Sequence, residues 1–229
     1  MEPLWGAWLG RVAYQPAFAL QQRVAGRRAA GEIPDSVLML EHEPVYTLGR
    51  RATEGEVLLD ATMLEQRGID VQHTDRGGRV TYHGPGQLVG YPIVDLGASG
   101  DLVGYVRRLE RALIALAADF GVRATTIDGL TGVWVGEAKI GAIGVHVSRG
   151  ITTHGFAFNV EPDLDAFNGI VPCGIVDKSV TSLAALSGRR VPMSLVFKRA
   201  GEQLATALDR ELRWRHPTVL LGQEERLHG

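Results

Sequence analysis

Apolar residues recur along the chain with two spacings, one typical of helices and one typical of strands. Helical spacing runs from Pro16, which suits a first helical turn, to about Ala30. It returns after Asp101, a favourable N-cap residue, and continues to about Phe120. Shorter or less regular runs predict further helices over residues 61–67, 163–168, 179–187 and 193–214.

The strand-like segments are short and are separated by glycine-containing turns. Residues 36–41 (SVLMLE) suit a buried strand, and residues 69–75 (IDVQHTD) alternate between polar and apolar. Residues 79–96 (RVTYHGPGQLVGYPIVDL) predict two strands around a Gly-Pro-Gly turn. Residues 130–160 predict three more strands joined by tight turns.

Helices and strands do not alternate strictly, and neighbouring hairpins favour antiparallel pairing. We therefore expect an α/β protein with a mixed, largely antiparallel sheet flanked by helices. No proline-rich or serine-rich linker divides the chain, so residues 1–229 are expected to form a single domain. The two ends of the chain, about residues 1–10 and 216–229, are expected to be peripheral tails.

Composition narrows the classes of function. The net charge is −2 and no basic stripe is present, so nucleic acid is not an expected partner. A single cysteine forms no internal disulfide and no thiolate metal site, which favours a reducing compartment. The sequence shows no signal peptide and no apolar run of membrane-spanning length, so a cytoplasmic protein without membrane contact is expected.

The 29 glycines concentrate in residues 76–100 and 129–155. Such clusters mark tight turns or places where the backbone approaches a ligand closely. In the first cluster, Arg76 and Arg79 flank a Gly-Gly pair whose N–H groups could bind a phosphate, a carboxylate or an acyl oxygen. A glycine-rich hairpin that only shapes the fold is an equally simple interpretation.

Two residues are candidates for chemistry. Cys173 lies in a Pro-Cys-Gly turn and is either a small buried thiol or a nucleophile. Lys139 lies early in a glycine-rich strand, where it either faces solvent, as strand lysines usually do, or points inward as a charged partner. The scattered histidines lack HxH or HxxxH spacing, and no GxSxG elbow is present, so neither a metal site nor a Ser-His-Asp triad is predicted.

Four separated motifs, RGGRVTYHGPGQLVGYP, KIGAIGVHV, HGFAFNV and IVPCGI, resemble in order and spacing the lipoyl(octanoyl) transferase family of lipoate biosynthesis. The similarity covers residues 40–183. The family shares a single-domain α/β fold with biotin and lipoate ligases. It moves an octanoyl group from acyl carrier protein, through a cysteine thioester, to a lysine of lipoyl domains in 2-oxoacid dehydrogenase subunits and the glycine cleavage H protein.

The resemblance assigns roles to particular residues. It implies that Cys173 is the nucleophile and Lys139 its partner, with no metal and no cofactor apart from the covalent octanoyl thioester. It places acyl binding on Arg76, Gly77, Gly78, Arg79, Val80, Thr81, Tyr82 and His83, on Ala142, Ile143 and Gly144, and on Gly155, Phe156 and Ala157. The side chains of Ile143 and Phe156 are expected to line an acyl tunnel. A monomer is expected.

The chemistry of the pair agrees with these roles. A thiol with a pKa of about 8.5 is only slightly ionised at neutral pH. An ammonium about 4 Å away contributes roughly 4 kcal/mol, enough to make the thiolate the dominant form. Backbone N–H groups near Gly77–Gly78 or around Cys173 are candidates for holding the oxyanion.

Three alternatives remain open from the sequence. An ATP-dependent lipoate or biotin ligase needs no cysteine nucleophile, and biotin ligases carry a longer basic glycine loop that this chain lacks. A transferase that moves octanoate between two lipoyl proteins would use the same residues. In a non-catalytic acyl-binding module, Cys173 and Lys139 would be incidental.

Overall fold

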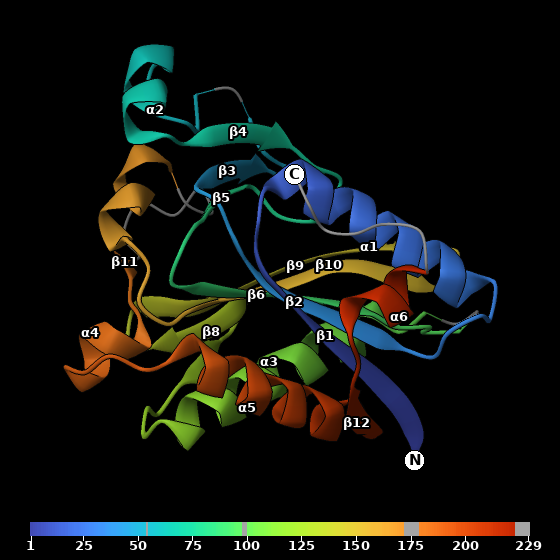
Figure 1. Cartoon of the computed structure of the whole chain (residues 1–229). Coiled ribbons are helices and arrows are strands. Elements are labelled where there is room, and N and C mark those ends of the chain that lie inside the picture. Colours follow the sequence, from blue (N-terminus) through green and yellow to red (C-terminus); the bar gives the residue numbers. More distant parts are fainter. Residues whose placement is uncertain (54, 98–99, 172–178, 223–229) are drawn as a thin grey trace.

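The computed structural model describes residues 1–53, 55–97, 100–171 and 179–222. A large mixed sheet crosses the molecule with helices on both faces (Figure 1). In spatial order its strands are β12 (Arg210–Trp214), β1 (Glu2–Val12), β2 (Ser36–His42), β6 (Gln87–Ile93), β10 (Ile151–Asn159), β9 (Ala138–Ser148), β8 (Leu130–Val135) and β7 (Thr125–Ile127), with β11 (Ser179–Val180) beside β9. All neighbours from β2 to β7 are antiparallel, whereas β12, β1 and β2 run parallel and β11 runs parallel to β9.

The helices form two layers that bury the two faces of this sheet. The amphipathic helices α3 (Leu102–Asp119) and α5 (Met193–Ala207) pack on one face, where Leu109, Leu113 and Leu204 are fully or almost fully buried. Helices α1 (Tyr14–Ala29) and α6 (Pro217–Leu221) cover part of the other face. The predicted cap of α3 is confirmed, because the carboxylate of Asp101 accepts a hydrogen bond from the Gly104 N–H at 2.8 Å.

A second, three-stranded sheet lies beside α1 and creates the space for a site. It consists of β4 (Asp70–His73), β3 (Val45–Leu48) and β5 (Val80–His83), with α2 (Ala61–Arg67) at its outer side. The short helix η1 (Leu164–Gly169) packs against it, and the rings of Tyr46, Tyr82 and Phe167 meet edge to face in its core.

The segment 79–96 forms two strands, as predicted, but they do not pair with each other. β5 pairs with β3, whereas β6 pairs with β2 and β10. The carboxylate of Glu41 accepts the Gly86 N–H at 2.6 Å, and the Gly86 carbonyl accepts two N–H groups at the end of β10. Gly86 also has a φ of 82°. The Gly-Pro-Gly turn is thereby fixed to the large sheet and leads the chain from one sheet to the other.

Three further expectations are corrected. Residues 2–10 and 217–221 are not peripheral tails, because β1 pairs on both sides in the large sheet and α6 buries Leu220 and Leu221 in the core. The last predicted helix ends at Ala207, and a φ of 56° at Asp209 turns the chain into β12. Residues 179–180 form β11, and α4 (Leu183–Ser187) begins only after the Ser182 cap.

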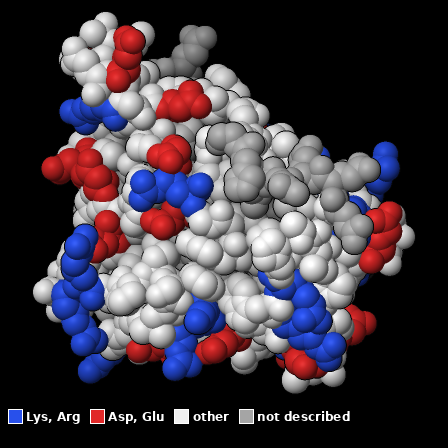
Figure 2. Space-filling view, in the orientation of Figure 1, with Lys and Arg blue, Asp and Glu red and all other residues white. Residues whose placement is uncertain are grey.

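The surface agrees with a protein of small net charge. On the face shown in Figure 2, acidic and basic side chains are interspersed rather than separated. Within the part of the chain that the structure describes, no helix is long and apolar enough to cross a membrane.

Candidate active site

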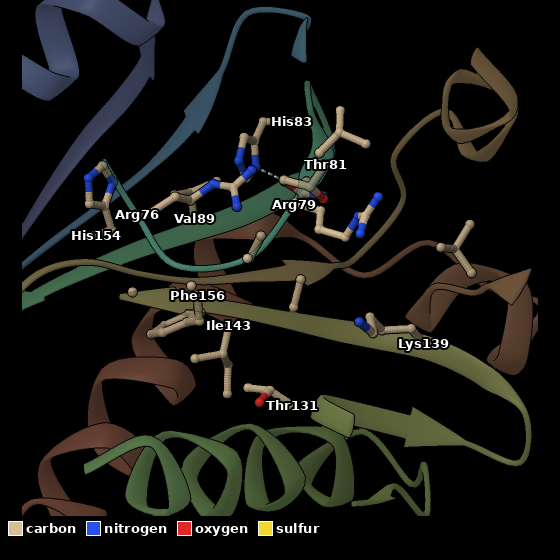
Figure 3. A pocket seen from close by; sticks show the side chains of 18 of the residues that line it. Arg76, Arg79, Thr81, His83, Val89, Thr131, Lys139, Ile143, His154 and Phe156 are labelled. Carbon is tan, nitrogen blue, oxygen red and sulfur yellow. Dashed lines mark hydrogen bonds between the residues drawn. The ribbon is translucent and has the colours of Figure 1, made fainter. Parts of the chain in front are cut away.

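A cavity of about 390 Å³ lies between the small sheet and the large one. Of the residues expected to bind the acyl group, all except Gly77 and Tyr82 line it, as does Lys139. Figure 3 shows Lys139 at one side of the cavity and His154, beside Arg76, at the other. Cys173 lies outside the described residues. Of the described residues that flank this segment, Ser179 lines the cavity and the Val171 N–H donates to the Glu56 carbonyl at 2.9 Å.

Gly77 and Tyr82 have structural positions instead. The Tyr82 ring is buried in the core of the small sheet. The Gly77 N–H donates to the Val145 carbonyl at 3.0 Å, so it is committed to β9 and is not available to an oxyanion. This bond brings the loop so close to β9 that a Cβ on Gly144 would lie 2.9 Å from the Gly77 carbonyl oxygen. The glycine at 144 therefore permits the close approach.

The walls of the cavity are partly apolar. Val80, Val89, Ala142 and Ala157 line it. The side chains of Ile143 and Phe156, expected to form an acyl tunnel, instead point to the α3 side of the sheet and join the core there. Gly90 makes room for the Phe156 ring, because a Cβ there would lie 2.3 Å from it.

Arg76 is buried and bound to the neighbouring backbone. Its guanidinium donates to the Thr47 hydroxyl at 2.8 Å, to the Thr47 carbonyl at 2.6 Å and to the Gly77 carbonyl at 3.0 Å. These bonds hold the arginine in one orientation and place a positive charge at the cavity wall.

A chain of buried hydrogen bonds extends from Thr47 across the cavity wall. The Thr47 hydroxyl lies 3.3 Å from His83 Nε2, and His83 Nδ1 lies 2.7 Å from Gln87 Oε1. Gln87 then donates to Asn159 at 2.9 Å, and Asn159 donates to the Thr181 carbonyl at 2.9 Å. Because an amide oxygen only accepts, His83 carries its proton on Nδ1. Burial, together with nearby His42 and Arg76, holds the pKa of His83 well below its usual range, so the ring is neutral.

His154 lies at the other side of the cavity in an uncommon backbone conformation. Its φ is 55°, and its N–H donates to Gln21 at 2.6 Å. Its Nε2 lies 2.6 Å from an Asp75 carboxylate oxygen. Burial lowers the pKa of His154 in spite of this carboxylate. His154, Gln87 and Asn159 also line the cavity. They stand in the motifs quoted above but were not singled out as site residues, because their positions depend on which strands meet.

Lys139 reaches the cavity because β9 contains a bulge. Between the pairs Val133↔Gly141 and Trp134↔Lys139, β9 has one extra residue, Ile140. Ile143 packs on the α3 side of the sheet, and regular alternation would place Lys139 on that side too. The fully buried Ile140 takes the core position, so Lys139 faces the cavity. The inward interpretation of Lys139 therefore fits the structure.

Opposite Lys139 on β8 stands Trp134. The Lys139 Nζ lies 4.6 Å from the centroid of the Trp134 ring, and both residues line the cavity. Among the described residues no three histidine, aspartate or glutamate side chains are arranged to hold a metal ion.

The sequence and the fold were compared with those of known proteins. Residues 13–205 match the family described as the lipoyl protein ligase A/B catalytic domain. A curated octanoyltransferase from Mycolicibacterium gilvum is 50% identical over 214 residues, which cover 91% of this chain and 87% of that protein. A bi-partite lipoate protein ligase from Thermoplasma acidophilum has the same fold, with a TM-score of 0.76 at 17% identity over 96% of this chain and 91% of that one.

The biotin protein ligase of Aquifex aeolicus, in complex with biotin and ATP, is a more distant structural neighbour. Its TM-score is 0.58 at 12% identity, over 89% of this chain and 70% of that one. The expected α/β fold of the biotin and lipoate ligases is confirmed by these two structures. The family match over residues 13–205 and the extensive identity to curated enzymes show that the chain belongs to the lipoyl protein ligase A/B catalytic domain family and, within it, to the octanoyltransferases.

Proposed function

We propose that this protein transfers an octanoyl group from octanoyl-acyl carrier protein to a lysine of lipoyl domains, through a thioester on Cys173, in endogenous lipoate biosynthesis. The acceptors are lipoyl domains of 2-oxoacid dehydrogenase subunits and the glycine cleavage H protein. The enzyme acts as a cytoplasmic monomer without metal or nucleotide. The observation that carries the proposal is the cavity, which has an inward-facing lysine and borders the chain on both sides of the Cys173 segment.

Covalent geometry supports a short distance between Cys173 and this cavity. Val171, two residues before Cys173, is bonded to Glu56, which pairs with the cavity residue Arg79. Two residues span at most about 7 Å. Val180 on β11 pairs directly with Lys139 on β9. These contacts connect the described residues on both sides of the Cys173 segment to residues of the cavity, which supports Cys173 as the nucleophile of the proposal.

The two half-reactions balance if Cys173 and Lys139 begin as thiolate and ammonium. The thiolate attacks the donor thioester, the acyl–sulfur bond to the carrier breaks, and Lys139 gives its proton to the departing carrier thiolate. The acceptor amine then attacks the acyl-enzyme and Cys173 leaves as a thiolate. Lys139 takes the proton that the amine loses, which restores the starting state. The amide product makes the second step favourable.

The decisive experiment is intact-protein mass spectrometry after mixing with octanoyl-acyl carrier protein. We expect one octanoyl adduct that hydroxylamine removes and that Cys173→Ala does not form. The adduct should disappear, with stoichiometric octanoylation, when a lipoyl domain is added. Full transfer by Cys173→Ala, or a wild type that transfers without ever carrying the adduct, would contradict the thioester route.

A further inference from the structure

We propose that Trp134 is a positioning residue for Lys139, and that its indole ring holds the lysine ammonium in the orientation used for proton transfer. The inference rests on the proposed role of Lys139 in acyl transfer. Trp134 stands directly opposite Lys139 in the β8–β9 register, and the Nζ–centroid distance is 4.6 Å. A cation within about 6 Å of an aromatic face is attracted by the ring quadrupole, and tryptophan gives the strongest such contact.

The ring is fixed more firmly than the lysine. Trp134 is 1% exposed, and its strand neighbours Val133 and Val135 pack into the core on the opposite face of the sheet. Lys139 is half-buried and has four rotatable carbons between its backbone and its charge. The contact therefore orients the flexible lysine ammonium, whereas the ring is already held in place by its own packing.

A second contact confines the stem of the lysine. Gly132, two residues before Trp134, has a φ of 125°, and a Cβ there would lie 3.4 Å from Lys139 Cε. The Gly132 N–H is bound by the buried carboxylate of Glu110 on α3 at 3.1 Å, and Arg107 holds the other oxygen of that carboxylate at 2.6 Å. Helix α3 thus anchors the part of β8 against which Lys139 lies.

The environment of the indole nitrogen is a further indication that Trp134 acts on Lys139 through the face of its ring. Nε1 is buried without a hydrogen-bond partner in the described part of the chain. An unsatisfied buried donor is unfavourable, and a phenylalanine would avoid that cost. Selection of the indole for its ring face, which lies against Lys139, accounts for the tryptophan.

The expected consequence is a loss of transfer rate rather than of substrate binding. A partly desolvated cation–π contact corresponds to about a fivefold to thirtyfold change in rate. We expect Trp134→Leu to lower kcat by that factor with little change in KM for the carrier protein. Trp134→Phe, which keeps an aromatic face, should recover most of the loss. Trp5→Leu is the matched control, because it removes another tryptophan that contacts a cation, Arg215, outside the residues that line the cavity.

Lysine-selective NMR tests the contact without relying on activity. The chain has only three lysines, so ¹³Cε-labelled lysine gives signals that Lys→Arg variants assign directly. In the wild type the ε-methylene protons of Lys139 should be shifted upfield by the ring current. They should return toward the Lys198 position in Trp134→Leu but stay in Trp5→Leu. Thermal melting must first show that each variant is folded.

The outcomes separate the inference from the proposed function. An unshifted Lys139 signal in the wild type would overturn the positioning role. A second result would also overturn it: Trp134→Phe keeps the upfield Lys139 signal but loses as much kcat as Trp134→Leu. The group that matters would then be the indole N–H and not the ring face. If the signal depends on Trp134 but Lys139→Arg transfers at the wild-type rate, the contact stands and the proposed role of Lys139 fails.

Discussion

Two histidines, His42 and His83, are buried as neutral rings, and their hydrogen bonds determine their tautomers. His42 Nδ1 lies 2.8 Å from the Val12 carbonyl, and its Nε2 lies 2.6 Å from the Tyr91 hydroxyl. A carbonyl only accepts, so the proton is on Nδ1 and Nε2 accepts from Tyr91. Burial lowers the pKa of His42 to about 4.

This lowered pKa predicts a loss of stability in mild acid. Between about pH 6.5 and pH 4 the unfolded chain binds a proton at His42 and the folded chain does not, so stability falls as the pH falls. The loss from His42 amounts to about 3 kcal/mol at the acid end of this window. Urea denaturation at several pH values should show a shallower decline in His42→Gln, which keeps a donor and an acceptor but does not titrate. If the stability of the two proteins fell in parallel with pH, His42 would be excluded as a source of the acid destabilisation.

The role proposed for Lys139 comprises two tasks, stabilising the Cys173 thiolate and transferring a proton, and two substitutions distinguish them. Lys139→Ala should move the pH profile of iodoacetamide alkylation about two pH units higher, because the Cys173 thiolate loses its cation. Lys139→Arg keeps the charge but does not release a proton at working pH, so it should preserve the profile while losing most of the transfer. Since Cys173 is the only cysteine, alkylation reports on it alone. Wild-type alkylation profiles in both folded variants would show that the two residues are not partners.

At the scale of elements, the decisive feature is the irregular pairing of β8 with β9. Gly132 sits beside the bulge with a φ of 125°, and a Cβ there would lie 2.7 Å from the Gly141 carbonyl oxygen. An L side chain at this position is both strained and crowded. The register that turns Lys139 toward the cavity thus depends on a residue in the neighbouring strand.

Gly132→Ala should therefore affect both stability and transfer. We expect it to lower the free energy of unfolding by at least about 1–3 kcal/mol, the usual cost of such a backbone conformation, and to slow transfer. Gly121→Ala is the matched control, since Gly121 has a φ of 77° and open space around it. It should cost stability through strain alone and leave transfer unchanged. Normal transfer by a folded Gly132→Ala variant would contradict this prediction, because the β8–β9 pairing would then tolerate a displacement of the strands without loss of activity.

The elements with clear local signals could be predicted from the sequence. The Asp101 cap with the apolar face of α3, and the alternating run from β8 to β10, are confirmed. β12 was missed because RELRW continues a helical run in composition, although its alternation is that of a strand. The separation of β5 from β6 and the bulge at Ile140 depend on partners distant in sequence, which local spacing does not specify. For the same reason the sequence identified Lys139 but not its partner Trp134.

At the scale of the whole molecule, the fold by itself does not select the reaction. A lipoate-protein ligase A bound with ATP shares it, with a TM-score of 0.73 at 16% identity. What assigns this chain to transfer rather than ligation is its identity to curated octanoyltransferases, 50% over 91% of the chain in one of them.

Transfer should accordingly need neither nucleotide nor metal. In buffer that contains EDTA and apyrase, octanoyl-acyl carrier protein and a lipoyl domain should yield the amide at the untreated rate, measured by mass spectrometry of the lipoyl domain. Free octanoate with ATP and Mg²⁺ should yield none. A strict requirement for ATP would instead support the ligase alternative.

The parallel pairing of β1 with β12 has a consequence for the synthesis of the protein. Glu2 is aligned with Arg210, and Gly6 with Trp214. At about 5–20 residues per second, a ribosome adds Arg210 roughly 10–40 s after Glu2. Throughout that interval the outer edge of β1 has no strand beside it, and unpaired edges are where other chains add strands. The nascent protein is therefore exposed to aggregation through this edge until β12 has been made, although the strands that line the cavity are already complete.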